Sequence, residues 1–419
     1  MRVKITKLKN LAERQKKLVS NFTHLSVLYS LNLIIPLLLY PYLIKVLGKE
    51  TYGLVIFAQS IISYFVLLVG FGFNLSATRE VSIHRDNKEK LDEIVSCVFI
   101  IMGILFVISL AILCFLIFFI PHLFLHKTLL LITMFSCLNE ILFPVWYFQG
   151  TEKMKNWTQI TLISRLIFLV LILIFVKVES DYLKVPLIQN IGYLFSGIFS
   201  IYIIFYKDRL TFSWQPWSVL RKFTTNSIPI FFSNISGNII SNTNKVLIGS
   251  FLGLAQVSLY DLAEKFLLVL KIPQIIITQG VFPKISIEKN ISIVKKLFMI
   301  SFVFNILFVI GVFCFANYVV VQFIGETMIS ATPIIKTMSV AILFSSVNSV
   351  LGTQVLIAFG HIREYRKAIV LTYLSFFAQI GILWGIDSIT LINLARSIVS
   401  IELLTSLYML YFCRKLIYK

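Results

Sequence analysis

Long apolar stretches constrain the fold of this chain more than any other feature of its sequence. Because a helix that spans a bilayer needs about 20 apolar residues, we predict transmembrane helices near residues 22–46, 53–75, 94–120, 128–148, 157–178, 185–206, 226–251, 255–281, 297–317, 327–359, 367–386 and 390–412. A β-barrel would need short segments of alternating polarity instead. The 419 residues are 58% hydrophobic and 14% charged, which is too apolar for a soluble fold. The sequence therefore predicts an all-α integral membrane protein with twelve transmembrane helices.

The placement of the positive charges predicts the orientation of these helices. The formal net charge is +19, and most Lys and Arg residues lie before the first helix, after the even-numbered helices and at the end of the chain. The opposite loops hold only Lys45, Lys49, Lys127, Lys177 and Lys184. The positive-inside rule then places both termini in the cytoplasm. The basic balance reflects topology, and no Lys/Arg patch with exposed aromatic residues indicates a nucleic-acid partner.

A polar link near the middle of the chain divides it into two predicted lobes. Residues 207–225 form the longest cytoplasmic connection and contain Pro216 between two Trp residues. We predict a basic cytoplasmic N-terminus at 1–20, a six-helix lobe at 21–206, this linker at 207–225, a second six-helix lobe at 226–412 and a cytoplasmic tail at 413–419. Transporters with duplicated lobes carry their substrate between them, so we expect a central cavity.

Polar residues interrupt the apolar stretch that opens the second lobe. Five of them lie within about a third of the circumference of one helix: Asn234, Asn238, Ser241, Asn242 and Lys245. The next helix carries Asp261, Glu264, Lys265 and Lys271. Each charge costs roughly 2.5–3.5 kcal/mol in lipid, so these faces are predicted to line an enclosed polar space.

The charges within the predicted spans are more often cationic than anionic. The cations are Arg165, Lys245, Lys265, Lys271, Lys336 and Arg396, and the anions are Glu140, Asp261, Glu264 and Glu402. An inward cationic surface suits an anionic headgroup such as a diphosphate. Lys245 and Lys271 have no obvious local partner, which makes them the first candidates, with Arg396 as a further one.

Three of these charged residues have an alternative interpretation that involves no substrate. Asp261 and Lys265 are spaced to form an i, i+4 ion pair, which would neutralise much of the surplus. Arg396 near a helix end can instead extend its guanidinium to the membrane surface.

A further pair of opposite charges lies in the first lobe. Glu140 and Arg165 fall on adjacent predicted helices, where they either form a structural ion pair or serve ion coupling. Asp261, Glu264 and Lys265 have the same two interpretations.

Four short motifs resemble those of Wzx-type O-antigen flippases, within the multidrug/oligosaccharidyl-lipid/polysaccharide exporter superfamily. They are Gly70 to Arg79 with Arg85-Asp86, Pro144-Val145-Trp146-Tyr147-Phe148-Gln149-Gly150-Thr151-Glu152-Lys153-Met154, Tyr260-Asp261-Leu262-Ala263-Glu264-Lys265, and Phe282-Pro283-Lys284. The resemblance covers nearly the whole chain. It departs at Val257-Ser258-Leu259, where relatives often carry glycine.

The resemblance implies translocation of an oligosaccharide repeat unit linked to undecaprenyl diphosphate, of O-antigen or capsule type, by alternating access. The expected location is the bacterial inner membrane, with membrane lipid and other polysaccharide-assembly proteins as partners. Lys245, Lys271 and Arg396 would hold the diphosphate. Asn234, Asn238 and Asn242 would contact sugar hydroxyls.

The sequence lacks the motifs that several other functions would require. No GxxxxGK[ST] motif occurs, and His122 with His126 lacks a third metal ligand, so neither cofactor nor metal is predicted. A drug/cation antiporter or a lipid II flippase of the same superfamily is the nearest alternative. A membrane polymerase or ligase of glycan assembly is the enzymatic alternative, although no nucleophile–base pair stands out.

Overall fold

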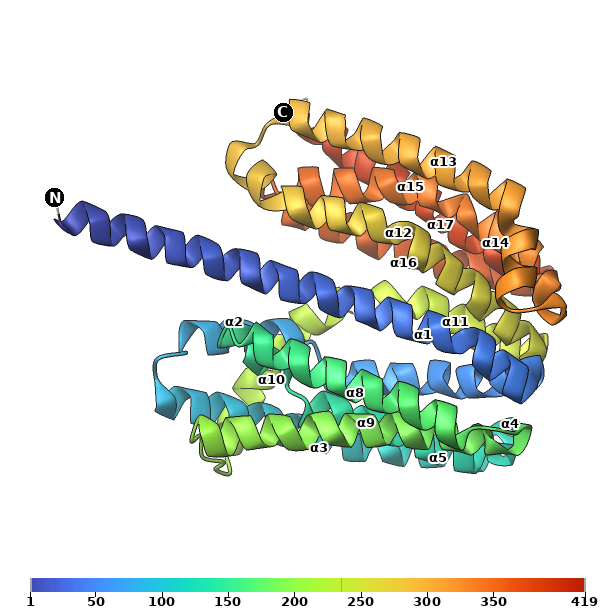
Figure 1. The fold of residues 1–419 in the computed structure, drawn as a ribbon, viewed down its shortest axis with the longest axis horizontal. Helices are drawn as coiled ribbons and strands as arrows, with labels where there is room; N and C mark the ends of the chain where they lie inside the picture. Colours follow the sequence, from blue (N-terminus) through green and yellow to red (C-terminus); the bar gives the residue numbers. More distant parts are fainter. Residues whose placement is uncertain (1, 235, 418–419) are drawn as a thin grey trace. The chain divides into compact units, whose positions relative to one another are not determined.

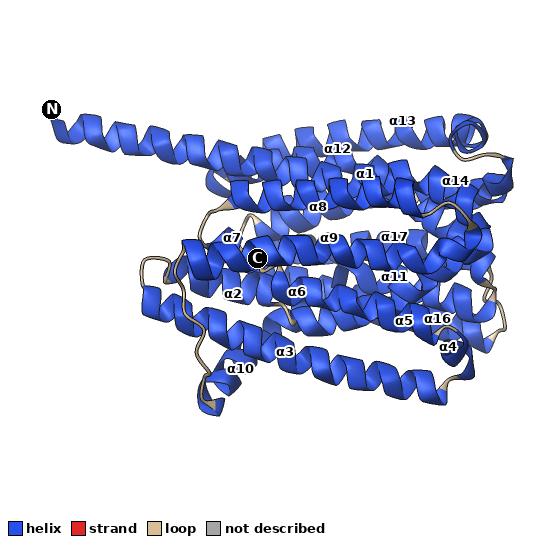
Figure 2. Ribbon diagram, turned by 60° about the horizontal axis from the view of Figure 1, so that its bottom comes forward, coloured by secondary structure: helices blue, strands red, loops and turns tan. Residues whose placement is uncertain are grey.

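The computed structural model describes the backbone of residues 2–234 and 236–417 and the side chains of residues 35–231, 239–278, 280–282 and 285–414. Helices and their connections make up this described part, which contains no strand (Figure 2). The chain divides into two compact units. The first comprises Met1–Leu39 and Ile61–Ile235, and the second comprises Tyr40–Ser60 and Ser236–Lys419.

The first unit is built from helices that follow the predicted apolar stretches (Figure 1). They are α1 (Arg2–Gly70), α2 (Phe73–Ile83), α3 (Lys88–Phe119), α4 (Pro121–Leu125), α5 (Lys127–Met134), η1 (Phe135–Cys137), α6 (Leu138–Leu142), α7 (Val145–Gly150), α8 (Met154–Phe175), η2 (Glu179–Leu183), α9 (Lys184–Ile201), the π-helical η3 (Tyr202–Lys207) and α10 (Trp217–Asn234).

The second unit repeats this all-helical construction. Its helices are α11 (Ser236–Phe251), α12 (Leu254–Glu288), α13 (Ile291–Phe323), η4 (Glu326–Ala331), α14 (Thr332–Ser339), α15 (Ala341–Asn348), the π-helical η5 (Ser349–Ile357), α16 (Ile362–Gly385) and α17 (Leu391–Ile417). The α1 segment Tyr40–Ser60 packs with them.

Ten helices in the described residues are long and apolar enough to cross a membrane. Two features separate this number from the twelve predicted spans. The first two spans fall within one candidate, Ile35–Ile83, because α1 continues through a sharp turn at Gly48 with φ of 75°. The seventh falls on α10 and α11, where the side chains of residues 232–238 lie outside the described part. The all-α multi-pass fold predicted from the sequence is confirmed.

Two motifs of the first unit pack against each other. α2 lies along α7, and a Cβ on Gly150 would come within 2.6 Å of Val81, so only glycine allows this approach. The Thr78 hydroxyl donates to the backbone oxygen of Trp146 at 3.3 Å, and Trp146 is buried. The motif residues therefore fix the contact between two helix ends.

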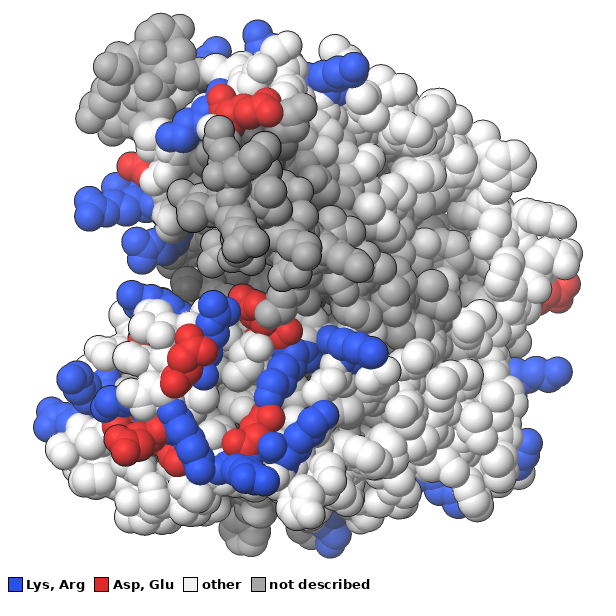
Figure 3. All heavy atoms as spheres, turned by 60° about the vertical axis from the view of Figure 1, so that its left-hand side comes forward, with Lys and Arg blue, Asp and Glu red and all other residues white. Residues whose placement is uncertain are grey.

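Charged side chains surround that contact. Figure 3 shows them gathered at the end of the first unit where α2, α3 and α7 lie. Arg85 pairs with Glu152 at 2.8 Å, Lys90 pairs with Glu93 at 2.7 Å, and Lys153 pairs with Asp208. The residues of this charged end belong to loops that the sequence predicts to be cytoplasmic.

Candidate functional site

A buried cluster of four charges lies in the second unit, between α11 and α12. Lys245 Nζ lies 2.5 Å from Glu264 Oε2 and 3.3 Å from Asp261 Oδ1. Lys265 forms the ion pair with Asp261 that their four-residue spacing predicts, and Ser241 donates a hydrogen bond to Glu264. The side chains of Lys245 and Asp261 are 11% and 4% exposed. Two cations thus meet two anions, and the cluster is balanced.

Tyrosines from the Tyr40–Ser60 segment complete this cluster. The Tyr52 hydroxyl donates to Asp261 Oδ2 at 3.2 Å, and Lys265 Nζ lies 5.0 Å from the centre of the Tyr40 ring. Close helix packing allows these contacts, because a Cβ on Gly53 would lie 1.9 Å from the Leu254 backbone oxygen. The third sequence motif, Tyr260 to Lys265, therefore forms a buried structural network.

The structure supplies partners on other helices for Lys245 and Lys271, which have no local partner in the sequence. Lys245 has two carboxylate partners, and Lys271 Nζ lies 2.8 Å from Glu402 Oε1 on α17. Neither lysine has a carboxylate one helical turn away on its own helix, and the partners of both lie on other helices. Paired in this way, neither lysine adds to a cationic surplus.

Next to this cluster the second unit contains a cavity of about 460 Å³. Its wall combines a few charges with many hydroxyl groups and several aromatic rings. The polar lining residues are Ser241, Tyr260, Glu264, Lys271, Ser345, Asn348, Ser349, Thr353, Tyr365, Thr372, Tyr373, Glu402 and Thr405. A volume of this order is typical of small-molecule sites, and apolar helices surround it.

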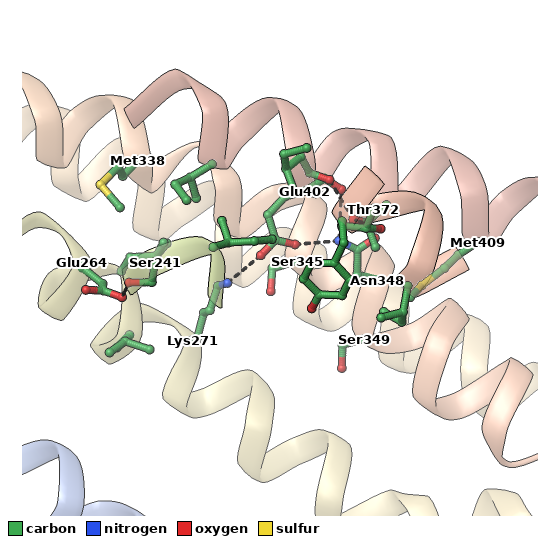
Figure 4. A pocket seen from close by; sticks show the side chains of 18 of the residues that line it. Ser241, Glu264, Lys271, Met338, Ser345, Asn348, Ser349, Thr372, Glu402 and Met409 are labelled. Carbon is green, nitrogen blue, oxygen red and sulfur yellow. Dashed lines mark hydrogen bonds and ion pairs between the residues drawn. The ribbon is translucent and has the colours of Figure 1, made fainter. Parts of the chain in front are cut away.

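Glu402 connects three helices at this cavity. Figure 4 shows Lys271 on α12 and Asn348 on α15 both pointing toward it. Asn348 Nδ2 donates to Glu402 Oε2 at 2.6 Å, and Ser406 donates to Asn348 Oδ1 at 2.7 Å. The π-helical η5, which begins at Ser349, adds Ser349 and Thr353 to the wall. Such helix distortions often occur at functional sites.

The other residues predicted for the site are placed elsewhere. Asn242 is half-buried on α11 but does not line the cavity. Arg396 is exposed on α17, where it donates to Asn393 at 3.3 Å. The side chains of Asn234 and Asn238 lie outside the described residues.

Glu140 and Arg165 are not brought together. Among the described side chains, no ion pair joins them. The Glu140 carboxylate instead faces Gly70, at the end of α1.

Sequence reasoning missed most of the cavity wall. Ser345, Ser349 and Thr353 lie four residues apart, and Asn348 lies three after Ser345, which is the spacing of one helix face. That spacing could have identified them. Their meeting with α16 and α17 could not be read from the sequence.

Together the fold and the cavity define a multi-pass membrane protein that encloses polar side chains within apolar helices. Residues 18–289 match the model of a family described as polysaccharide biosynthesis protein. That match covers more than half of the chain, and the chain belongs to this family.

Two curated proteins with the same name are similar to this chain in sequence. An Escherichia coli (strain K12) protein named as a candidate O-antigen transporter is 26% identical over 84% of this chain and 86% of its own length. A Shigella dysenteriae protein with the same name is 30% identical over 64% of this chain and 67% of its own length.

Solved structures of low sequence identity share the fold. The lipid II flippase MurJ aligns with a TM-score of 0.75 and 17% identity, over 95% of this chain and 87% of its own. A multidrug resistance MATE family transporter of the MOP superfamily aligns with a TM-score of 0.72 and 14% identity, over 91% of this chain and 94% of its own.

Proposed function

We propose that this protein moves a polyprenyl-diphosphate-linked oligosaccharide repeat unit across the bacterial plasma membrane. The observations that support this most directly are membership of a polysaccharide biosynthesis family and two curated relatives named as candidate O-antigen transporters. The proposed activity is transport by alternating access and makes no covalent bond. The protein is proposed to lie in the inner membrane with both termini cytoplasmic, because the basic loops favour that orientation.

The cavity of the second unit has the chemistry that a sugar requires. Hydroxyl groups such as Ser345 and Thr372 and the Asn348 amide can both donate and accept hydrogen bonds. The rings of Tyr365 and Tyr373 provide apolar faces beside them. We propose that sugar hydroxyls bind to this wall, while the polyprenyl chain stays in lipid.

Lys271 is the cation best placed to contact the diphosphate. It lines the cavity and has one carboxylate partner, Glu402, at 2.8 Å. A phosphate oxygen can replace that carboxylate at the ammonium group, since both are anionic acceptors. Lys245 has two carboxylate partners within 3.3 Å, so we assign it to the structural network.

The leaflet location of the lipid-linked repeat unit tests this function. In a strain that lacks this gene, the intermediate is expected to accumulate on the cytoplasmic side, and surface polysaccharide is expected to disappear. The measurement uses a membrane-impermeant reagent that labels the sugar only in the outer leaflet. Re-expression of the gene should restore both.

The other outcomes point to the alternative functions. Accumulation in the outer leaflet would overturn the proposal in favour of a polymerase or ligase. Unchanged glycan intermediates would overturn it in favour of drug export. Accumulation of lipid II alone would indicate a peptidoglycan-precursor flippase.

A further inference from the structure

Two interrupted membrane spans lie in the first unit. α1 ends at Gly70 and α2 begins at Phe73, and between them Phe71 and Gly72 have positive φ of 41° and 71°. The candidate span Lys127–Gly150 is divided into α5, η1, α6 and α7, with a break at Phe143 and Pro144. Helix interruptions at membrane depth expose backbone groups and often mark ion or substrate sites.

Glu140 lies where these two interruptions meet. Its Oε2 atom is 3.2 Å from the position that a Cβ on Gly70 would occupy. The last carbonyls of a helix have no partner within that helix, and they form the negative end of its dipole. A carboxylate beside them is therefore disfavoured, whereas a protonated carboxyl can donate a hydrogen bond.

The residue before Glu140 provides another hydrogen-bond acceptor without a donor. Asn139 lies next to Glu140 on α6, and its Oδ1 atom is buried without a hydrogen-bond donor. An unsatisfied buried acceptor costs about 1–3 kcal/mol. Asn139 Oδ1 is therefore a buried acceptor without a donor, in the residue next to Glu140.

The other three carboxylates predicted within spans differ from Glu140. Asp261 and Glu264 pair with Lys245, and Glu402 pairs with Lys271. For Glu140, the described part of the chain shows neither an ion pair nor a hydrogen bond from its carboxylate. Of the four carboxyls that the sequence analysis placed within spans, Glu140 is thus the one without a cationic partner in the described structure.

Several helices that pack against α6 carry titratable side chains, and none of these side chains is bonded to Glu140. α6 packs against η1, α9 and α3. η1 carries the buried thiol of Cys137, and α9 carries Tyr193, bonded to Gln189, and Lys184, paired with Asp181. On α3, Lys90 pairs with Glu93, and Asp92 accepts a hydrogen bond from Thr211. The other titratable residues of α3 are Lys88, Glu89, Cys97 and Cys114. None of these forms a hydrogen bond or ion pair with Glu140 in the described structure.

We propose that Glu140 is a proton-binding site and that proton exchange there drives translocation of the repeat unit. The carboxylate takes one proton from the aqueous phase on one side of the membrane and releases it to the other, with no change of oxidation state. This inference rests on the proposed function and deepens it by naming the coupling ion and its residue.

The test measures how a pH gradient shifts the leaflet distribution of the substrate. The purified full-length protein is reconstituted in liposomes with a fluorescent polyprenyl-diphosphate-linked oligosaccharide, and an impermeant quencher reports the outer-leaflet fraction. If one proton is exchanged per lipid, one pH unit shifts the distribution ratio about tenfold. Glu140→Gln should abolish this shift, and Glu140→Asp should retain it.

A matched control is Glu402→Gln, which changes a paired carboxylate of the second unit. It should retain the shift even if its transport rate falls. The inference is overturned if Glu140→Gln keeps the tenfold shift, or if a sodium gradient drives the wild type instead. Wild-type protein that moves no lipid under any gradient would overturn the proposed function itself.

A second measurement tests the protonation of Glu140 directly, so it also applies if the Glu140→Gln variant folds but does not transport. Infrared spectroscopy detects the C=O band of a protonated carboxyl group directly. Wild-type protein near neutral pH should show this band, and Glu140→Gln should lack it. Its absence from the wild type, or its persistence in the variant, would contradict the assignment.

Discussion

The Tyr52 hydroxyl donates a 3.2 Å hydrogen bond to the Asp261 carboxylate across 209 residues of chain. The same hydroxyl accepts from Lys265 Nζ at 3.3 Å. One phenol therefore bridges both members of an ion pair on α12. This relationship ties the Tyr40–Ser60 segment to the second unit, although that segment precedes most of the first unit in sequence.

Tyr52→Phe should destabilise the protein by about 1.5–3 kcal/mol, because it removes a buried hydrogen bond to a charged group. The ring and its packing against Tyr40 remain. Thermal unfolding in detergent measures the change. Tyr318→Phe is the matched control, since Tyr318 is 66% exposed on α13. Equal midpoints for the two variants would show that the hydroxyl contributes nothing.

Lys245→Met should destabilise more strongly, by about 3–5 kcal/mol, because it leaves buried carboxylates without their cation. Asp261 keeps Lys265, but Glu264 loses its ion-pair partner. Adding Glu264→Gln should therefore recover part of the loss. A double-mutant cycle of unfolding midpoints measures this coupling, and strictly additive effects would refute the pairing as an energetic unit.

Gly150→Ala should destabilise the first unit by about 1–3 kcal/mol through overpacking. The added Cβ would lie 2.6 Å from Val81 and 3.0 Å from the Thr78 backbone oxygen. Val81→Ala in the same chain should relieve part of the strain. Gly103→Ala is the control, because a Cβ there meets nothing within 4 Å. Comparable losses of detergent-extracted, folded protein for both alanine variants would argue against a steric cause.

Lys271→Gln should reduce surface polysaccharide at least several-fold, whereas Arg396→Gln should leave it near the wild-type level. Lys271 lines the cavity, and Arg396 is exposed outside its lining. Complementation of a deletion strain, with both variants matched for membrane abundance, provides the measurement. The reverse pattern would favour Arg396 as the headgroup contact and would remove Lys271 from the proposed site.

The positions of the spans could be predicted because a membrane helix is a local property of the sequence. In lipid, each backbone group must be satisfied within its own helix, so about 20 apolar residues suffice to define a span. The predicted stretch 157–178 corresponds to α8, and 367–386 corresponds to α16. The ion pair between Asp261 and Lys265 could be predicted for the same reason, since both lie on one helix.

Contacts between helices could not be predicted in this way. Lys245 has no local partner in the sequence because the positions one turn away on its own helix are neutral, whereas its partners lie on α12. The partner of Lys271 is 131 residues away. No spacing rule within one helix connects such residues.

The sequence alone therefore determined an all-helical membrane protein with polar residues inside its apolar spans, since the cost of polar groups in lipid acts on each segment separately. Only the tertiary structure decided that Lys271 and Asn348 meet at Glu402, and that the Glu140 carboxyl meets the end of α1 without a cation. The physical reason is that pairing energy depends on distances between helices, and these are set by packing of the whole unit.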